Sequence, residues 1–346
     1  MPAYQVIACP CDYDNLGIEQ SLLEAAGATL TRSYAESPET LIHEIEDADA
    51  LLVQYTQMTE DILARLRKCQ VIVRYGTGYD NFDLAAATEH GIYAANVPDY
   101  CKDEVATHAL ALLLSLVRRI VQYNEDAKRG VWDAHSQRPI HNLREQVVGI
   151  VGFGRIGRTF SKLVKPLFGS VLACDPYIDP SIFEEYGVER ADLHTTLRTS
   201  DVVSLHVLLT YEPTAQYDQP TYHLIGQKEL EMMKPSVYLV NTARGGVVDD
   251  RALRKALTDG QIAGAGLDVI ENAPESRDGS ELVVRYGDLL TSGKLILTHH
   301  VAYLSEESLR RTHRIVAEEV VRVLQGGEPR ALLNPEVRKK ARAALR

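Results

Sequence analysis

Short apolar segments alternate with segments of helical periodicity through the N-terminal third of the chain. Continuous apolar runs predict strands at residues 4–8, 50–53, 71–74 and 92–95. Between them, apolar residues at helical spacing predict helices over residues 16–26, 39–45, 60–68 and 82–90. Ser37 followed by Pro38, and Thr59 further on, are typical helix starts. Such alternation predicts a small parallel α/β domain.

A long helix and a second series of strands organise the rest of the chain. The segment that begins at Asp103 keeps apolar residues on one helical face as far as Ile120. Further strands are predicted at residues 147–151, 170–175, 201–207, 236–241, 263–269 and 294–298. Strands connected in this way by helices predict a doubly wound dinucleotide-binding domain. A last helix has Ser305 as its N-cap and ends at Gly326.

Three segments do not fit either pattern. Residues 211–220 and 273–293 have mixed polarity, and we expect them to be inserted surface loops. Residues 336–346 are strongly basic, and a short frayed helix is expected there.

The composition limits the classes of partner. A chain of 346 residues is long for one hydrophobic core and suits two domains. Its net charge of −11 argues against nucleic acid or an anionic membrane as a main partner. The longest apolar run, residues 109–117, is too short to cross a bilayer, and the N-terminal sequence lacks the pattern of a signal peptide.

The five cysteines are scattered along the sequence. Cys9 and Cys11 have no second cysteine or histidine pair at zinc spacing, so no metal site is expected. An odd number of cysteines in a chain of this size is typical of reduced thiols, and we expect a cytoplasmic location. The cysteines are interpreted as small core or loop residues.

A glycine motif follows the strand predicted at 147–151. Gly152, Gly154 and Gly157 have the spacing with which a tight turn places a pyrophosphate on the N-terminus of a helix. Arg155 and Ile156 lie within the motif. The string alone is weak evidence, because glycine-rich turns are common.

Asp175 lies about 20 residues past the glycines, where an acid that binds the ribose hydroxyls is expected. Its carboxylate would repel a 2′-phosphate, and Pro176 and Tyr177 supply no cation to offset the repulsion. The sequence therefore predicts NAD rather than NADP as the cofactor. The alternative is that Asp175 is only a turn residue at the end of a strand.

Five segments in order resemble the D-isomer-specific 2-hydroxyacid dehydrogenase family. They are VRYGTGYDNFDLAAATEHGIYAANVPDY (73–100), VVGIVGFGRIG (147–157), LVNTARGGVVDD (239–250), GAGLDV (264–269) and LTHHVAYLSEES (297–308). Within the family, the chain looks most like the branch of phosphoglycerate dehydrogenase-like and C-terminal-binding-protein-like members.

The resemblance implies an α/β fold with two domains and a cleft between them. A flavodoxin-like substrate domain would span residues 1–120 and be completed by residues 305–346. A Rossmann NAD-binding domain with a doubly wound parallel sheet would span residues 121–304. A homodimer is also implied.

The resemblance places the chemistry on Arg244 and His300. Hydride transfer to a 2-keto acid requires a cation for the carboxylate and carbonyl, and an acid that protonates the developing alkoxide. Arg244 matches the family's catalytic arginine and His300 its proton donor. The alternatives are an arginine in a surface ion pair and a core or solvated histidine. His299 is adjacent, but the downstream Ala302 and Ser305 favour His300.

Further residues match the family's binding positions. The strand end and loop that would bind a small anionic substrate comprise Arg74, Tyr75, Gly76, Thr77 and Gly78. Arg74 would suit a substrate with a second anionic group, although it could equally form a structural ion pair. Besides Arg244, His300 and the glycine motif, the cofactor would contact Thr77, Thr107, Asp175, His206, Val207, Thr242, Ala243 and Asp268.

The sequence departs from the family at Ala273, where members have a glutamate that hydrogen-bonds the catalytic histidine. Alanine can neither orient an imidazole nor stabilise its protonated form. Three interpretations follow: Glu271 or Glu275 substitutes, the reaction needs less proton transfer, or catalysis is weakened.

Two functions are therefore predicted. The leading one is an NAD-dependent oxidoreductase that interconverts a small D-2-hydroxy acid and its 2-keto acid. The alternative is a corepressor-like protein that senses NAD(H) with weak or no turnover. Ala273 favours this alternative, whereas Arg244 and His300 together argue against it.

Overall fold

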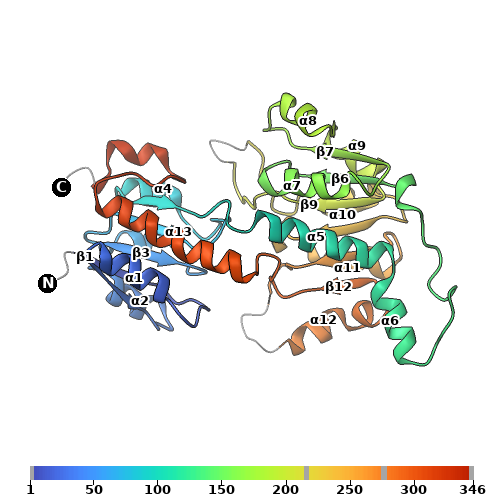
Figure 1. The fold of residues 1–346 in the computed structure, drawn as a ribbon, viewed down its shortest axis with the longest axis horizontal. Coiled ribbons are helices and arrows are strands. Elements are labelled where there is room, and N and C mark those ends of the chain that lie inside the picture. The colour runs from blue at the N-terminus through green and yellow to red at the C-terminus, as the bar shows by residue number, and fades with distance from the viewer. Residues whose placement is uncertain (1–3, 214–217, 274–278, 343–346) are drawn as a thin grey trace. The chain divides into compact units, whose positions relative to one another are not determined.

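The computed structural model describes residues 4–213, 218–273 and 279–342. The chain forms two compact units (Figure 1). The first unit comprises Met1–Cys101 and Ser305–Arg346, and the second comprises Lys102–Leu304. The boundary lies after Cys101 and not at the predicted residue 120, so the helix over residues 102–117 belongs to the second unit.

The first unit contains a five-stranded parallel sheet with the order β2-β1-β3-β4-β5. This is the flavodoxin-like order, as predicted. Its strands are β1 (Tyr4–Ala8), β2 (Ala28–Arg32), β3 (Ala50–Val53), β4 (Val71–Arg74) and β5 (Tyr93–Ala95). Strand β2 was not predicted, because this edge strand is half exposed and has no continuous apolar run.

Five α-helices and a short 3-10 helix surround this sheet in the described part of the first unit. They are α1 (Gly17–Ala25), α2 (Pro38–Ile45), α3 (Glu60–Leu63), α4 (Leu84–Glu89), α13 (Glu306–Leu324) and the 3-10 helix Pro335–Lys339. Ser37 caps α2 and Ser305 caps α13 through their side chains, as predicted. Thr59 makes no such bond, and α3 ends well before the predicted Lys68.

The segment after α13 is held to strand β5. The N–H of Leu333 donates to the carbonyl oxygen of Ala94 at 2.8 Å, and the side chain of Asn334 accepts from the N–H of Ala94 at 2.9 Å. The expected basic helix takes the form of the 3-10 helix, and residues 343–346 lie outside the described residues.

The second unit contains a seven-stranded parallel sheet with the order β12-β11-β10-β9-β6-β7-β8. The order reverses between β6 and β9, which defines a doubly wound Rossmann sheet and confirms the predicted fold class. The strands are β6 (Val147–Val151), β7 (Ser170–Cys174), β8 (Glu189–Arg190), β9 (Val202–Leu205), β10 (Tyr238–Asn241), β11 (Gly264–Leu267) and β12 (Leu295–Leu297).

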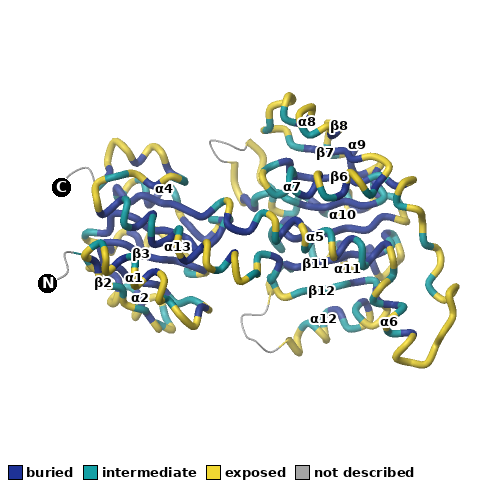
Figure 2. Tube along the Cα trace, viewed as in Figure 1, coloured by how far each residue is buried: buried dark blue, intermediate teal, exposed yellow. Residues whose placement is uncertain are grey.

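Helices cover this sheet, and its strands are largely buried except for the exposed edge strand β8 (Figure 2). The α-helices are α5 (Lys102–Val117), α6 (Ile120–Lys128), α7 (Arg155–Val164), α8 (Pro180–Tyr186), α9 (Leu193–Thr199), α10 (Gln227–Met232), α11 (Asp250–Thr258) and α12 (Ser280–Thr291). The 3-10 helices are Leu143–Glu145 and Gly245–Val247.

Helix α5 belongs to the second unit because its apolar face is part of that unit's core. Leu112, Leu113 and Leu116 are buried with Ile150 and Val240. A side chain at Gly266 of β11 would lie 3.1 Å from the Cβ of Leu112, so glycine allows the helix to approach the sheet closely. The predicted long helix ends early, at Val117, and Arg119 before the next helix has a left-handed φ of 56°.

The expectation of a loop over residues 273–293 was wrong for most of that segment. Residues 280–291 form α12, and Tyr286 and Leu289 pack in the core of the second unit. Its charged and apolar residues are mixed because only one face is covered. Within the two predicted inserts, residues 214–217 and 274–278 lie outside the described residues. In the part of the chain that the structure describes, no helix is long and apolar enough to cross a membrane.

Candidate active site

The glycine motif lies at the carboxyl end of β6, where the strand order reverses. Gly152 has a φ of 92°, and a Cβ there would lie 2.6 Å from the backbone of His206 after β9. A Cβ on Gly157 would lie 2.2 Å from the carbonyl oxygen of Gly152, so α7 packs directly on the turn. Gly154, the N-cap of α7, has no atom within 4 Å of the corresponding position. Gly152 and Gly157 therefore allow the backbone to pack closely. Gly154 leaves open space at a helix N-terminus, where a phosphate binds favourably.

Asp175 follows β7 and is tied to this turn. One carboxylate oxygen accepts from the N–H of Phe153 at 2.8 Å, and the other accepts from the N–H of Tyr177 at 3.0 Å. The side chain is half-buried. A carboxylate oxygen has more than one lone pair, so these bonds orient Asp175 and still allow it to accept from ribose hydroxyls.

His206 and Val207 follow β9, beside the glycine turn. The Nε2 atom of His206 lies 2.9 Å from the hydroxyl of Ser204, and its ring centroid lies 5.0 Å from that of Phe160. Burial lowers the pKa of His206 to about 3, because the charged imidazole loses its hydration. The ring is therefore uncharged at neutral pH, and it contributes to packing beside the glycine turn without adding charge there.

Thr242, Ala243 and Arg244 follow β10 at the same edge of the sheet. The Thr242 hydroxyl is buried and, within the described part of the chain, has no hydrogen-bond partner. Such a group is costly unless a ligand or water binds it, and a cofactor that bears hydroxyl and amide groups would satisfy it. Together with the open space at Gly154, this observation shows that the edge fits a dinucleotide.

The turn that carries Arg244 is fixed on both sides. The Asn241 side chain donates to the carbonyl oxygen of Arg244 at 2.9 Å. A Cβ on Gly245 would lie 2.0 Å from the carbonyl oxygen of Ile270, so the turn packs against the segment that follows β11. Arg244 itself is half-buried.

Asp268 follows β11 and organises the segment after β12, which carries His300. Its carboxylate is 1% exposed and accepts from the Thr298 hydroxyl at 2.6 Å and from the N–H groups of Val301 and Ala302, each at 2.9 Å. His300 lies between these donors with a left-handed φ of 56°. Sequence reasoning predicted a cofactor contact for Asp268. The structure adds that this carboxylate holds the loop of the predicted proton donor.

Sequence reasoning did not identify His108 on α5. Its Nε2 lies 3.0 Å from the Thr298 hydroxyl and 3.6 Å from the Asp268 carboxylate. Its neighbour Thr107 is exposed, and the Thr107 hydroxyl donates to the carbonyl oxygen of Asp103 at 2.8 Å. The only sequence signal for His108 was its position next to Thr107, because the contact joins residues 190 positions apart.

Arg74, the predicted substrate-binding cation, is the last residue of β4 in the first unit. It is 8% exposed, and its Nε donates to Asn81 at 3.2 Å. Asn81 in turn donates to the carbonyl oxygen of Thr56 at 2.8 Å. Gly76 has a φ of 144°, and a Cβ there would lie 2.1 Å from a guanidinium nitrogen of Arg74. The glycine therefore makes room for the guanidinium, and Asn81 is a site residue that sequence reasoning missed.

Tyr75 does not present its side chain to the loop surface. Its hydroxyl donates to the fully buried Glu19 at 2.6 Å, and its N–H donates to the carbonyl oxygen of Val53 at 2.8 Å. The N–H of Gly76 donates to Arg74. The backbone N–H groups of Tyr75 and Gly76, two of those predicted to bind a carboxylate, therefore already donate to backbone carbonyl oxygens. The Thr77 carbonyl accepts from Asn96 at 2.5 Å.

Glu271 and Glu275 are the acids that were expected to compensate for Ala273. Ala273 is exposed, and Glu275 lies outside the described residues. One carboxylate oxygen of Glu271 accepts from the Tyr222 hydroxyl at 2.7 Å and lies 2.9 Å from Nε2 of His223. Glu271 therefore has partners of its own.

The comparisons with known proteins agree with this arrangement. The model for the NAD binding domain of D-isomer specific 2-hydroxyacid dehydrogenases matches residues 110–302. A glyoxylate reductase of Thermococcus litoralis is 36% identical over 304 residues, which cover 86% of this chain and 87% of that protein. A D-3-phosphoglycerate dehydrogenase of Methanocaldococcus jannaschii is 37% identical over 290 residues, which cover 83% of this chain and 52% of that longer protein.

A solved structure matches most of the chain, including both units. The D-lactate dehydrogenase of Aquifex aeolicus, complexed with NAD and lactic acid, matches with a TM-score of 0.76 and 27% identity over 93% of this chain and 94% of that one. The chain belongs to the D-isomer specific 2-hydroxyacid dehydrogenase family. It is an NAD-dependent oxidoreductase that interconverts a 2-hydroxy acid and its 2-keto acid. The corepressor-like alternative has no support in these comparisons.

Proposed function

We propose that Arg244 and His300 carry the reaction and that the edge of the second sheet binds the cofactor. One observation carries this assignment. Strands β6, β9, β10, β11 and β12 are parallel neighbours in one sheet, so the segments that follow them share an edge. Those segments contain Gly152, His206, Arg244, Asp268 and His300.

The role of each residue follows from its chemistry. NAD, when bound, supplies the hydride acceptor or donor. Gly154 leaves space for the phosphates, and Asp175 accepts from the ribose hydroxyls. Arg244 binds the substrate carboxylate and polarises the carbonyl, because its guanidinium is always charged and planar. His300 holds the proton that passes to the carbonyl oxygen in reduction and accepts it in oxidation.

The substrate that fits the first unit best is a small anionic D-2-hydroxy acid or its 2-keto acid. The N–H groups of Thr77 and Gly78 are suited to one carboxylate, and the buried Arg74 supports a second anionic group. The relatives are named for substrates with one and with two anionic groups, glyoxylate and D-3-phosphoglycerate.

The assignment is tested by following NADH oxidation with a panel of 2-keto acids, some of which carry a second carboxylate or a phosphate. We expect turnover with wild-type protein and none with Arg244→Ala, which should still bind NADH. Arg74→Ala should impair the substrates with two anionic groups more than glyoxylate. An active Arg244→Ala variant would contradict the role of Arg244.

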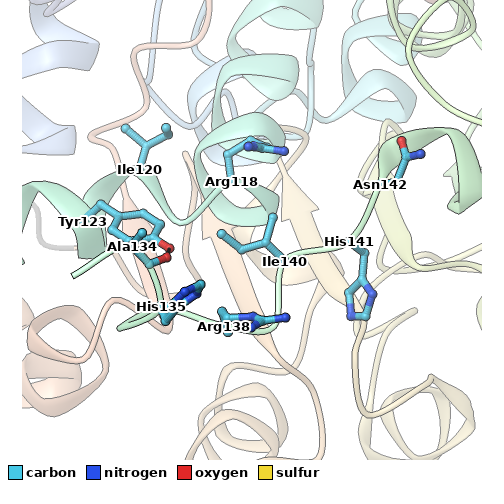
Figure 3. Close-up of a pocket in the computed structure, with 9 residues that line it drawn as sticks. All are labelled: Arg118, Ile120, Tyr123, Ala134, His135, Arg138, Ile140, His141 and Asn142. Atoms are coloured by element: carbon cyan, nitrogen blue, oxygen red, sulfur yellow. Dashed lines mark hydrogen bonds between the residues drawn. The ribbon is translucent and has the colours of Figure 1, made fainter.

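We further propose that the protein is a homodimer. In the second unit, Trp132 is 95% exposed, and Ile120 is 56% exposed nearby in the sequence. The same segment forms a pocket (Figure 3), lined by Arg118, Ile120, Tyr123, Ala134, His135, Arg138, Ile140, His141 and Asn142. A side chain as large as tryptophan is seldom fully exposed in a monomer. Sedimentation should show a dimer that Trp132→Ser weakens, and a wild-type monomer would refute this proposal.

The cytoplasmic location also stays a proposal. The five cysteines form no disulfide, and four of them are buried, as expected for a protein of a reducing compartment. Fractionation of cells that express the protein would test it.

A further inference from the structure

Tyr222 and His223 form a cluster with Glu271 beside the turn that carries Arg244. The rings of Tyr222 and His223 are stacked, with centroids 3.9 Å apart. Both reach the same carboxylate oxygen of Glu271, from 2.7 Å and 2.9 Å respectively. The other ring nitrogen of His223 lies 3.8 Å from Asp249. The mechanism above gives none of these side chains a task.

The cluster is connected to the Arg244 turn through the backbone. The N–H of His223 donates to the carbonyl oxygen of Gly246 at 2.8 Å, two residues after Arg244. The ring of Tyr222 lies 3.3 Å from where a Cβ on Gly246 would be. Ile225 continues the connection, because its N–H donates to the carbonyl oxygen of Val247 at 3.0 Å.

Glu271 connects the same turn to the segment after β11. Gly245 packs on the peptide between Ile270 and Glu271, where a Cβ would meet the nitrogen of Glu271 at 2.5 Å. Arg285 of α12 donates to the carbonyl oxygen of Glu271 at 3.0 Å, which fixes this segment from the other side. The side chain of Glu271 is only 17% exposed.

The backbone of His223 is held in an unusual conformation. Its φ is 53°, a left-handed value that is uncommon for residues other than glycine, although asparagine, aspartate and histidine adopt it more often than most. The surrounding contacts must therefore stabilise this conformation. The bond to Glu271, the stack on Tyr222 and the ion-pair distance to Asp249 are contacts that its side chain makes.

We propose that His223 and Glu271 are positioning residues that set the Arg244 turn against the segment after β11. The proposal rests on the role of Arg244 given above. The function of Glu271 here is to accept two hydrogen bonds, not to take over the charge of the carboxylate that is missing at Ala273. A displacement of about 1 Å at a reacting group can cost about 100-fold in rate, so small shifts of this turn matter.

The experiment compares Glu271→Ala with Glu271→Gln. The glutamine amide oxygen can accept from both Tyr222 and His223, whereas alanine accepts from neither. We expect Glu271→Ala to lower kcat by about 10- to 100-fold, with NADH affinity unchanged. Glu271→Gln should retain most of the wild-type kcat. His223→Asn, which suits a left-handed φ but does not reach Glu271, should resemble Glu271→Ala.

A matched control pair exists in the first unit. His90 lies 3.0 Å from a carboxylate oxygen of Glu60, close to the 2.9 Å between His223 and Glu271, but Glu60 begins α3 and His90 follows α4 in the first unit. Glu60→Ala should leave kcat unchanged. If Glu271→Ala also leaves kcat unchanged, the inference is wrong. If Glu271→Gln is as inactive as Glu271→Ala, the charge of Glu271 is what matters, and the inference is again overturned.

Amide hydrogen exchange provides a readout that does not depend on turnover. Glu271→Ala should accelerate exchange in residues 244–248, and Glu271→Gln should not. This result can be obtained even if no 2-keto acid is reduced, in which case the proposed function fails and the inference is judged separately. Unchanged exchange in Glu271→Ala would overturn the inference.

Discussion

The backbone N–H of His300 donates to the carbonyl oxygen of Asp268 at 2.8 Å, so the end of β11 directly holds the residue proposed as the proton donor. The Asp268 carboxylate then accepts from residues on both sides of His300. A buried carboxylate that accepts several hydrogen bonds leaves little freedom to the loop it binds. The imidazole therefore starts from a fixed backbone, although His300 lies in a loop.

Replacement of His300 by asparagine should abolish catalysis without unfolding the loop. Asparagine tolerates a left-handed φ but cannot donate a proton as imidazolium does. We expect kcat to fall by about 10²- to 10⁴-fold, with NADH binding retained in a fluorescence titration. His299→Asn, at the neighbouring position, should remain active. The reverse result would move the proton donor to His299.

Replacement of Ala273 by glutamate should shift the pH optimum for reduction upward. A carboxylate near His300 would stabilise its protonated form, so the acid stays available at higher pH. Ala273 is exposed, and the longer side chain can be accommodated. The pH profile of kcat/KM is the measurement, and Ala25→Glu, at an exposed position of α1, controls for the added charge. An unchanged profile would show that His300 needs no such partner.

The glycines of the turn should differ when each is replaced by alanine. Gly154→Ala should keep its melting temperature but bind NADH poorly, because the methyl group fills open space where a phosphate is expected. Gly157→Ala should lose about 1–3 kcal/mol of stability, since the methyl group would meet the Gly152 carbonyl at 2.2 Å. Gly287→Ala in α12, where the nearest atom is at 3.8 Å, should weaken neither property. A destabilised Gly154→Ala would contradict the open space.

Replacement of Asp175 by asparagine should weaken the preference against NADP. The charge that repels a 2′-phosphate is removed, while an oxygen remains to accept from Phe153 or Tyr177. We expect the ratio of kcat/KM for NADPH over NADH to rise about tenfold, which corresponds to about 1.4 kcal/mol. Asp192→Asn is a matched control, because Asp192 also accepts a backbone N–H, from Thr195. Equal ratios in wild type and Asp175→Asn would refute the role of Asp175.

Burial of His206 should make the protein less stable in mild acid. The unfolded chain takes up a proton near the ordinary pKa of 6.5, whereas in the folded chain burial lowers the pKa of His206 to about 3. Unfolding therefore binds a proton between these values, and the free energy of unfolding falls as pH drops below 6.5. From about pH 7 to about pH 5, wild type should lose more stability than His206→Gln in chemical denaturation. The exposed His43 supplies a control, His43→Gln. Parallel losses in wild type and His206→Gln would contradict the burial.

The sequence by itself determined most of the elements and the fold class. Apolar runs and helical periodicity are local properties, so strands such as β6 and β10 were predicted within a residue or two of their ends. The spacing of Gly152, Gly154 and Gly157 predicted the cofactor turn for the same reason. The resemblance then named Arg244 and His300 from short matching segments, because each lies in a continuous motif.

Only the tertiary structure decided which residues support the site. Asp268 and His108 both contact Thr298, and Glu271 contacts His223. These pairs are separated by 30 to 190 residues, and a local sequence pattern does not predict contacts over such separations. Helix α5 joins the second unit because Gly266 admits Leu112, and α12 forms because its apolar face is covered. Such contacts depend on which strands become neighbours in the sheet, and neighbouring strands are chosen by packing over the whole unit.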